Sequence, residues 1–376
     1  MITRGRIAFK ILSCLIAIAF ILILFSSLNQ QNDSYHDEFI SVETVRQIEE
    51  EIQSGTLVNL NNFKYEINND ICKRNGRELI GIIIVTCYVG HDELRAAHRR
   101  AIPQGKLIEM GFSRVFLLAE IPKTEKYITQ SQVLDENKKF GDILQGNFME
   151  AYRNLTYKHI MGLKWASTNC FRAKFIIKMD DDVVYDVFHL KNYLESLEIK
   201  GFPKSFMAGY ILDNKTPIRL TANKWFVTRD EYASDVYPAY LSGWLYITNP
   251  NTTLQLVRQS QTEKFFWIDD TWVTGVLRDQ LSIPLIKLNS WFSSNADFLD
   301  CCVRDLKDFN YECEYFVGPN GGDTKLIVEF LHGIEKCYFD ECNKRSPEHS
   351  LKQTCVASAK QFIPDHGDAL IRAVKL

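Results

Sequence analysis

The ten residues AKFIIKMDDD, numbered 173–182, join a short apolar run to three consecutive carboxylates. Residues 175–177 have the length and β-branched content of a strand buried on both faces, which is typical of a parallel sheet covered by helices. Because side chains alternate along an extended backbone, we expect Asp180 and Asp182 to point to one side and Asp181 to the other. Two carboxylates at the carboxyl edge of such a sheet suit Mg²⁺ or Mn²⁺ that holds a nucleotide pyrophosphate. A solvated acidic turn is the alternative.

Two apolar runs upstream fit the same sheet. Residues 78–86 (ELIGIIIVT) and 114–119 (RVFLLA) each predict a buried strand, and the basic segment 95–100 between them predicts a helix. A strand, a helix and a second strand at this spacing indicate a right-handed crossover and a parallel sheet.

A long helix is expected after residues 142–145. Its predicted buried stripe comprises Phe148, Tyr152, Leu155, His159 and Leu163. On this stripe His159 is interpreted as a packed core histidine rather than as a ligand.

The composition excludes two classes of protein. Of 376 residues, 46% are hydrophobic and 24% are charged, so the chain can bury a large core and is not compositionally disordered. The net charge is -3 and no basic stripe dominates, so we do not expect a nucleic-acid binder.

The first 28 residues predict a membrane anchor. Three basic residues within residues 1–10 precede residues 11–28, an uncharged run about long enough to cross a bilayer. The positive-inside rule then makes residues 1–10 a cytosolic tail and places everything after Asn29 in the lumen. A cleaved signal peptide is the alternative, which the length of the run disfavours. Residues 29–77 are polar and are interpreted as a stem.

Sequons and cysteines agree with a luminal body. The pattern for N-glycosylation occurs at Asn32, Asn154, Asn214 and Asn251, of which we expect Asn154 to stay unmodified because it lies early in a predicted helix. Of ten cysteines, Cys14 lies in the predicted anchor. The remaining odd number favours disulfides together with a free thiol or an intermolecular bridge, in a connectivity that sequence leaves open.

The second half of the chain is rich in aromatic residues beside acids. Aromatic planes next to carboxylates commonly hold sugar rings. The tryptophans concerned are Trp225, Trp267 and Trp272, of which the last two flank the pair Asp269 and Asp270. Core packing is the alternative for each of these tryptophans.

Five ordered blocks between residues 78 and 331 resemble the β1,3-galactosyltransferase and β1,3-N-acetylglucosaminyltransferase family. They are residues 140–158, KMDDDV (178–183), PIR with KWFV (217–219 and 224–227), YPAYLSG (237–243) and DDTWV (269–273). Five positions depart from the family pattern. Residues 101–102 replace a Thr-Trp pair, Leu241 replaces a cysteine, Asp269 replaces a glutamate and Thr274 replaces a glycine.

The resemblance implies a GT-A fold, an α/β arrangement of a mostly parallel sheet flanked by helices. It also implies a UDP-sugar donor, Mn²⁺ or Mg²⁺, inversion at the anomeric carbon and a glycan acceptor on a glycoprotein or glycolipid. Such a transfer requires a metal to neutralise the departing diphosphate and a base on the opposite face.

The resemblance assigns roles to residues as follows. Asp182, Asp180 and His332 are the expected metal ligands, and Asp270 is the expected catalytic base beside Asp269. The donor is expected to contact Asp180, Asp181, Arg95, Arg99 and Lys158. The acceptor is expected to contact Trp225, Tyr240, Ser242, Gly243 and Trp272.

The resulting hypothesis is a Golgi single-pass type II hexosyltransferase. Residues 78–340 form its catalytic domain, with a nucleotide-binding half (78–190) and an acceptor half (191–340), and residues 341–376 form a cysteine-containing tail. One alternative is a luminal glycan-binding or chaperone-like protein that has lost turnover. Another alternative is a metal-dependent glycosidase that uses Asp180 and Asp270. This alternative does not explain the nucleotide-binding half, because a glycosidase needs no nucleotide. A homodimer and a complex with other transferases both stay open.

Overall fold

The computed structural model describes residues 55–74, 79–320 and 322–356. The predicted cytosolic tail, the predicted anchor, most of the predicted stem, Asn32 and the end of the C-terminal tail lie outside the described residues. Within the described ranges no helix has the length and apolar content to span a membrane.

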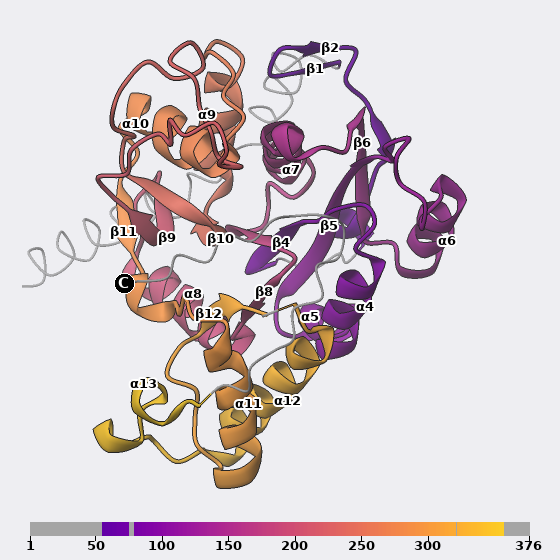
Figure 1. The fold of residues 1–376 in the computed structure, drawn as a ribbon. Coiled ribbons are helices and arrows are strands. Elements are labelled where there is room, and N and C mark those ends of the chain that lie inside the picture. Colours follow the sequence, from indigo (N-terminus) through magenta and orange to yellow (C-terminus); the bar gives the residue numbers. More distant parts are fainter. Residues whose placement is uncertain (1–54, 75–78, 321, 357–376) are drawn as a thin grey trace, which may run out of the picture. The chain divides into compact units, whose positions relative to one another are not determined.

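An eight-stranded mixed sheet organises the fold, in the strand order β11-β9-β10-β7-β4-β5-β6-β3 (Figure 1). Its centre is parallel and consists of β6 (Ile143–Met149), β5 (Phe112–Glu120), β4 (Gly81–Thr86) and β7 (Phe175–Asp180). Antiparallel neighbours flank this centre, namely β3 (Tyr65–Ile67) beside β6 and β10 (Tyr240–Thr248) beside β7. The sheet continues through β9 (Met207–Leu212) and β11 (Leu285–Lys287). This confirms the predicted α/β class.

Helices cover both faces of the sheet, which explains why every residue of β4 is buried. One face packs against α4 (Asp92–Ala101), α8 (Val187–Lys200), α11 (Asp297–Phe309) and α12 (Thr324–Asp340). The other face packs against α7 (Leu155–Asn169) and α9 (Pro250–Gln259). The close approach of α7 depends on Gly162, because a Cβ there would lie 2.4 Å from Leu117 Cδ1.

The predicted helix after residues 142–145 is only partly right. Residues 143–149 form the strand β6, and α7 begins at Leu155 after the 3-10 turn η1 (Tyr152–Asn154). Hydrogen bonding along β5 satisfies the backbone of this segment and overrides its helical spacing. His159 and Leu163 are fully buried on α7, as predicted, whereas Tyr152 is exposed.

Short elements complete the described chain. They are β1 (Thr56–Leu57), β2 (Leu60–Asn61), α3 (Ile71–Arg74), α5 (Gln104–Glu109), α6 (Gln130–Phe140), β8 (Val183–Tyr185), η2 (Thr271–Leu277), α10 (Arg278–Gln280), η3 (Asn289–Trp291), β12 (Val317–Pro319), η4 (Pro347–His349) and α13 (Leu351–Thr354). The strands β1 and β2 form a hairpin, and β8 pairs with β12.

Four disulfides supply the connectivity that the sequence leaves open. They are Cys72–Cys170, Cys301–Cys355, Cys302–Cys313 and Cys337–Cys342. Cys87 is the free cysteine of the described residues, and it is buried. The predicted presence of disulfides is thereby confirmed.

Candidate active site

The strand β7 delivers Asp180 to the carboxyl edge of the parallel sheet. Lys178, two residues earlier on the same side of the strand, is buried and donates from Nζ to Asp180 Oδ1 (2.6 Å) and to the backbone oxygen of Gly243 (2.9 Å). Burial raises the pKa of Asp180 to about 7 against the opposing charge of Lys178. This carboxyl group is therefore held in place by a fixed cation of the sheet.

Asp181 points away from Asp180, as the alternation of a strand predicts. Its Oδ2 lies 2.7 Å from His91 Nδ1, and its backbone oxygen lies 2.8 Å from His98 Nε2. Together with Cys87 and His91, Asp181 forms the one group of three potential metal ligands in the described part of the chain whose ligand atoms lie within 4.8 Å of one another. Sulfur and nitrogen make this set softer than Mn²⁺ or Mg²⁺ prefers.

The predicted set of metal ligands is not brought together as a whole. Asp182 is exposed beside Asp180 in sequence, but His332 lies on the exposed side of α12 and forms no such group with the two acids within the described residues. His332 faces solvent because α12 turns Leu331 and Ile334 to the core. Its role as a metal ligand stays a prediction.

Asp269 and Asp270 precede η2 and differ in environment. His159 Nδ1 lies 2.9 Å from Asp269 Oδ2, and His159 Nε2 lies 2.6 Å from the Tyr246 hydroxyl. Burial lowers the pKa of His159, so the ring is neutral. A carboxylate can only accept, so Nδ1 donates to Asp269 and Nε2 accepts from Tyr246. Burial alone would raise the pKa of Asp269, but this hydrogen bond and the charge of Lys178 outweigh it and lower the pKa.

Asp270 lies directly across Gly243 from Asp180. Its Oδ2 accepts from the Gly243 N–H (3.3 Å) and its Oδ1 accepts from the Thr271 N–H (2.8 Å). Burial, followed by the charge of Asp269, raises the pKa of Asp270 to about 6. A Cβ on Gly243 would lie 3.3 Å from Asp180 Oδ2 and 3.7 Å from Asp270 Cβ, so the two acidic motifs meet at this glycine.

An aromatic rim lies beside these acids. Trp225 is exposed and donates from Nε1 to the Tyr152 hydroxyl (2.7 Å), while Lys224 Nζ lies 4.5 Å from the Trp225 ring centroid. Burial raises the pKa of Tyr152, the hydrogen bond from Trp225 lowers it, and the charges of Asp269 and Asp270 raise it further. The Tyr152 ring lies 6.2 Å from the ring of Trp267, two residues before Asp269, centroid to centroid.

The other predicted acceptor residues divide between the site and the core. Burial and then the charge of Asp270 raise the pKa of the partly exposed Tyr240 to about 12. Ser242 is partly exposed next to Gly243. Trp272 is the exception, because it is buried and donates from its indole nitrogen to the Lys264 backbone oxygen. The expected sugar contact of Trp272 is therefore corrected to core packing.

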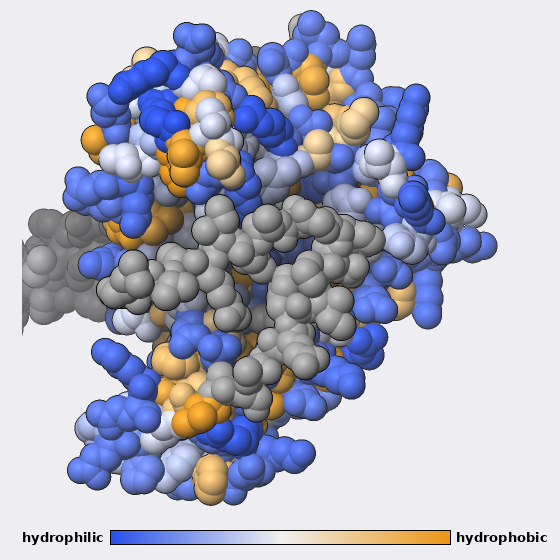
Figure 2. Space-filling view, in the orientation of Figure 1, coloured by the Kyte–Doolittle hydropathy of each residue, from blue (hydrophilic) through white to orange (hydrophobic). Residues whose placement is uncertain are grey.

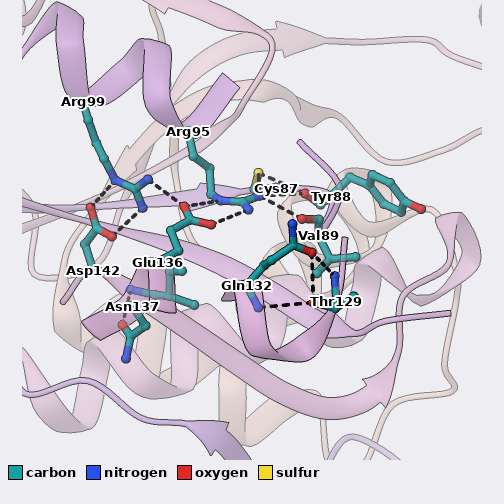
Figure 3. Close-up of polar contacts among 11 residues, drawn as sticks. Cys87, Tyr88, Val89, Arg95, Arg99, Thr129, Gln132, Glu136, Asn137 and Asp142 are labelled. Atoms are coloured by element: carbon teal, nitrogen blue, oxygen red, sulfur yellow. Dashed lines mark hydrogen bonds and ion pairs between the residues drawn. The ribbon is translucent and has the colours of Figure 1, made fainter. Parts of the chain in front are cut away.

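The three basic residues expected at the donor lie in buried ion pairs. Arg95 and Arg99 of α4 both bind Glu136 of α6, and Arg99 also binds Asp142, as Figure 3 shows. Arg95 additionally donates to the backbone oxygens of Tyr88 and Val89, at 3.2 and 3.1 Å.

Lys158 is similarly engaged, with Glu150 (2.5 Å) and the Cys87 backbone oxygen (2.6 Å). Removing one partner of a buried pair leaves an uncompensated charge. Arg95 and Lys158 consequently hold the β4–α4 loop in place. Direct contact of Arg95, Arg99 and Lys158 with the donor stays a prediction.

The described sequons differ in their surroundings. Asn214 is exposed. Asn251 donates from Nδ2 to the Lys204 backbone oxygen and to Ser205 Oγ, both at 3.0 Å, and Asn154 donates from Nδ2 to the Met149 backbone oxygen (2.9 Å). Their modification stays a prediction.

Sequence reasoning missed four site residues: Lys178, His91, Tyr152 and Tyr246. A lysine inside the apolar run of β7 was the available signal for the first of them, because a buried lysine requires a paired charge. The partners of His159 lie about a hundred residues away along the chain and gave no signal.

Comparison with known proteins gives a consistent set of relatives. The family model described as Galactosyltransferase matches residues 95–289. Beta-1,3-galactosyltransferase 5 of Homo sapiens is 27% identical over 266 residues, which cover 69% of this chain and 80% of that protein. The same protein of Gorilla gorilla gorilla is 34% identical over 178 residues, which cover 46% of this chain and 58% of that protein. Beta-1,3-galactosyltransferase 2 of Homo sapiens is 28% identical over 59% of this chain and 52% of that protein.

Among solved structures, the WbbM bifunctional glycosyltransferase matches at 11% identity with a TM-score of 0.34. The match covers 72% of this chain and 50% of that one. A TM-score this low does not define a shared fold.

Proposed function

This chain belongs to the galactosyltransferase family, and from that premise we propose that it transfers galactose or an N-acetylhexosamine from a UDP-sugar to a glycan acceptor in β1,3 linkage with inversion. The relatives are beta-1,3-galactosyltransferases by name, which supports a transferase of this type. Donor, linkage and acceptor are parts of the proposal.

One observation carries the proposal: Asp180 and Asp270 flank Gly243, Asp180 paired with Lys178 and Asp270 bonded to backbone N–H groups. An inverting transfer needs a base for the acceptor hydroxyl and separate groups for the donor diphosphate. Asp270, with its raised pKa and its place beside the aromatic rim, fits the base. Asp269, kept ionised by His159, fits a group that orients the acceptor and keeps Asp270 basic.

A divalent metal is part of the proposal, and it is supported by the carboxylate oxygens available as metal ligands. Asp180 and Asp182 offer hard oxygen ligands at the edge of the sheet, and these are the residues that would hold Mn²⁺ or Mg²⁺. A metal bound there supplies charge neutralisation for the departing diphosphate. Asp181 is already engaged with His91, so we assign it to support of this loop rather than to the ion.

A GT-A arrangement and a luminal location complete the proposal. The parallel strands β4, β5, β6 and β7 form the nucleotide half, and β9, β10 and η2 contribute the acceptor half. Four disulfides support an oxidising compartment. The uncharged run at residues 11–28 supports a single-pass type II anchor, which we place in the Golgi membrane.

The test is a donor screen of the purified full chain. UDP release is measured with UDP-galactose, UDP-N-acetylglucosamine, UDP-N-acetylgalactosamine and UDP-glucose, with Mn²⁺ and a panel of glycan acceptors. We expect one donor to dominate, its turnover to require an acceptor, and chelation of the metal to abolish it. Tight donor or glycan binding without turnover for every donor would instead assign the chain to a glycan-binding or chaperone-like role.

A further inference from the structure

A cavity of about 450 Å³ lies between the β1–β2 hairpin, the end of β6 and the start of α7. None of the residues that line it belongs to the acidic cluster at Gly243, and none carries a charge. Its volume is within the range of small-molecule sites. The cavity is therefore a second concave surface that the proposed chemistry does not use.

One wall of the cavity is aromatic and fixed. The rings of Phe63 and Phe148 lie 6.4 Å apart, and those of Phe148 and Tyr157 lie 5.9 Å apart, centroid to centroid. Tyr157 in turn stacks on Phe265, at 4.8 Å and an interplanar angle of 19°. Phe63 and Phe148 are buried by this packing, whereas Tyr157 keeps part of its surface open. Such a wall offers a rigid apolar surface to a ligand.

The rest of the lining consists largely of amides. Asn147 is held by the backbone, since its Oδ1 accepts from the Lys64 N–H and its Nδ2 donates to the Asn62 oxygen, both at 2.9 Å. Asn61 and Asn62 have exposed side chains that make no hydrogen bond among the described residues. Neutral donors and acceptors beside aromatic rings complement the hydroxyl groups and the apolar faces of a neutral sugar.

Exposed apolar side chains connect the cavity to the acidic cluster. Met149 lines the cavity and is 57% exposed, and Tyr152, three residues later, is 51% exposed. Tyr152 accepts the hydrogen bond of Trp225, which is 42% exposed, and its ring lies 6.2 Å from the ring of Trp267, three residues before Asp270. Figure 2 shows hydrophobic residues among hydrophilic ones around the β1–β2 hairpin.

We propose that this cavity is a saccharide subsite, which holds the distal end of the acceptor glycan while the terminal sugar lies at Asp270. The assignment rests on the proposed function. It requires acceptors of several sugars to reach from the aromatic rim past Met149 into the cavity. It therefore predicts that the KM for the acceptor falls as the acceptor becomes longer.

The experiment compares acceptors of increasing length on the full chain. The probes are β-linked oligosaccharides of one to four sugars that end in N-acetylglucosamine or in galactose. The variant is Asn61→Ala/Asn62→Gly. Glycine is chosen at position 62 because Asn62 has a φ of 84°, which glycine adopts without strain. Asn310→Gly is the matched control, with a φ of 52° at the end of α11.

In the wild type and in the Asn310→Gly control we expect KM to fall about tenfold between the shortest and the longest acceptor, the gain of two or three hydrogen bonds and one ring contact. In the cavity variant we expect this gain to disappear, with kcat and the KM of the shortest acceptor unchanged. An equal gain in the cavity variant would overturn the proposal. A wild type whose KM does not depend on acceptor length would also overturn it.

The failure of the subsite and the failure of the proposed function can be told apart. If no donor is turned over, saturation-transfer NMR with the same oligosaccharides still measures which of their sugars contact the protein. Contacts to the distal sugars that vanish in the cavity variant and persist in Asn310→Gly support the subsite. Contacts that persist in both variants reject it.

Discussion

At the scale of single residues, the site depends on how two adjacent carboxyl groups are kept different. Asp269 receives the hydrogen bond of His159, whereas Asp270 receives only backbone N–H groups and faces the charge of its neighbour. Both acids were predicted from their motif, because the motif lies within a few residues. The resemblance also predicted different roles for them, with Asp270 as the base, but the contacts that make their surroundings differ could not be predicted, since His159, Tyr246 and Lys178 come from distant elements.

Asp270→Asn should separate catalysis from binding. A general base contributes typically about 10²- to 10⁴-fold to the rate, so we expect kcat to fall by about that factor. The affinities for UDP and Mn²⁺ should change little, because Asp180 and Asp182 are assigned to the donor side. Transfer kinetics and UDP titration measure the two effects. Asp279→Asn, at an exposed carboxylate on α10, is the control. An unchanged kcat in the Asp270 variant would transfer the role of base to another group.

His159→Leu should act on Asp270 through Asp269. Without this hydrogen-bond donor the pKa of Asp269 rises, so that its carboxyl group carries less negative charge at acid pH. That charge is one of the two causes that raise the pKa of Asp270, so the pKa of Asp270 should fall. We expect the acid limb of the kcat profile to move to lower pH and kcat to drop by roughly tenfold, less than in Asp270→Asn. His159→Gln, which keeps an N–H donor, should recover part of the loss. If the acid limb of the kcat profile does not move, His159 contributes only to core packing.

At the scale of elements, the sequence predicted the strands that are buried on both faces and misjudged the segment at their edge. The β4, β5 and β7 strands are mostly apolar, apart from Arg114 in β5 and Lys178 in β7, so their type follows from local composition. The apolar residues of the segment 143–149 are spaced in a way that is compatible with a helix. The segment forms a strand because its backbone pairs with β5. Such pairing is a tertiary effect that a single sequence does not display.

The start of α8 supplies a pH-dependent test of stability. Asp186 caps this helix by accepting from the His189 N–H (2.8 Å), and burial raises its pKa to about 6. For an acid with a raised pKa the folded state binds the proton more tightly. Its contribution to stability is therefore fully present below the unfolded pKa near 4 and is lost as pH rises through about 6.

Asp186→Asn should remove this dependence, because asparagine caps a helix about as well and carries no charge. We expect the variant to match the wild type near pH 4 and to exceed it above pH 6, by on the order of 1 to 2 kcal/mol in the free energy of unfolding. Urea unfolding at both pH values is the measurement. Asp323→Asn, the same exchange at the N-cap of α12, controls for the loss of a charged cap. A wild type that gains stability over the variant between pH 4 and pH 6 would contradict the argument.

At the scale of the whole described fold, the two predicted halves meet where β10 lies antiparallel beside β7. This pairing places Gly243 between Asp180 and Asp270, although about 90 residues separate the two acids in the chain. The sequence shows the order of the motifs that contain Asp180, Gly243 and Asp270. Their contact required the register of β10 on β7, which no local pattern encodes.

The last prediction concerns how much two of the disulfides contribute to the free energy of unfolding. Cys72–Cys170 closes a loop with a sequence separation of 98 and joins α3 to the end of α7, whereas Cys337–Cys342 closes one with a separation of 5 at the end of α12. A disulfide restricts the unfolded chain more when its loop is longer, by about 4.7 kcal/mol for a loop of about 100 residues and roughly 2 kcal/mol for one of about 5. We therefore expect Cys72→Ala/Cys170→Ala to lower the free energy of unfolding by about twice as much as Cys337→Ala/Cys342→Ala. Urea unfolding of both double variants under non-reducing conditions measures the difference. Equal losses would show that local packing around each bridge, rather than the length of the loop, sets its contribution.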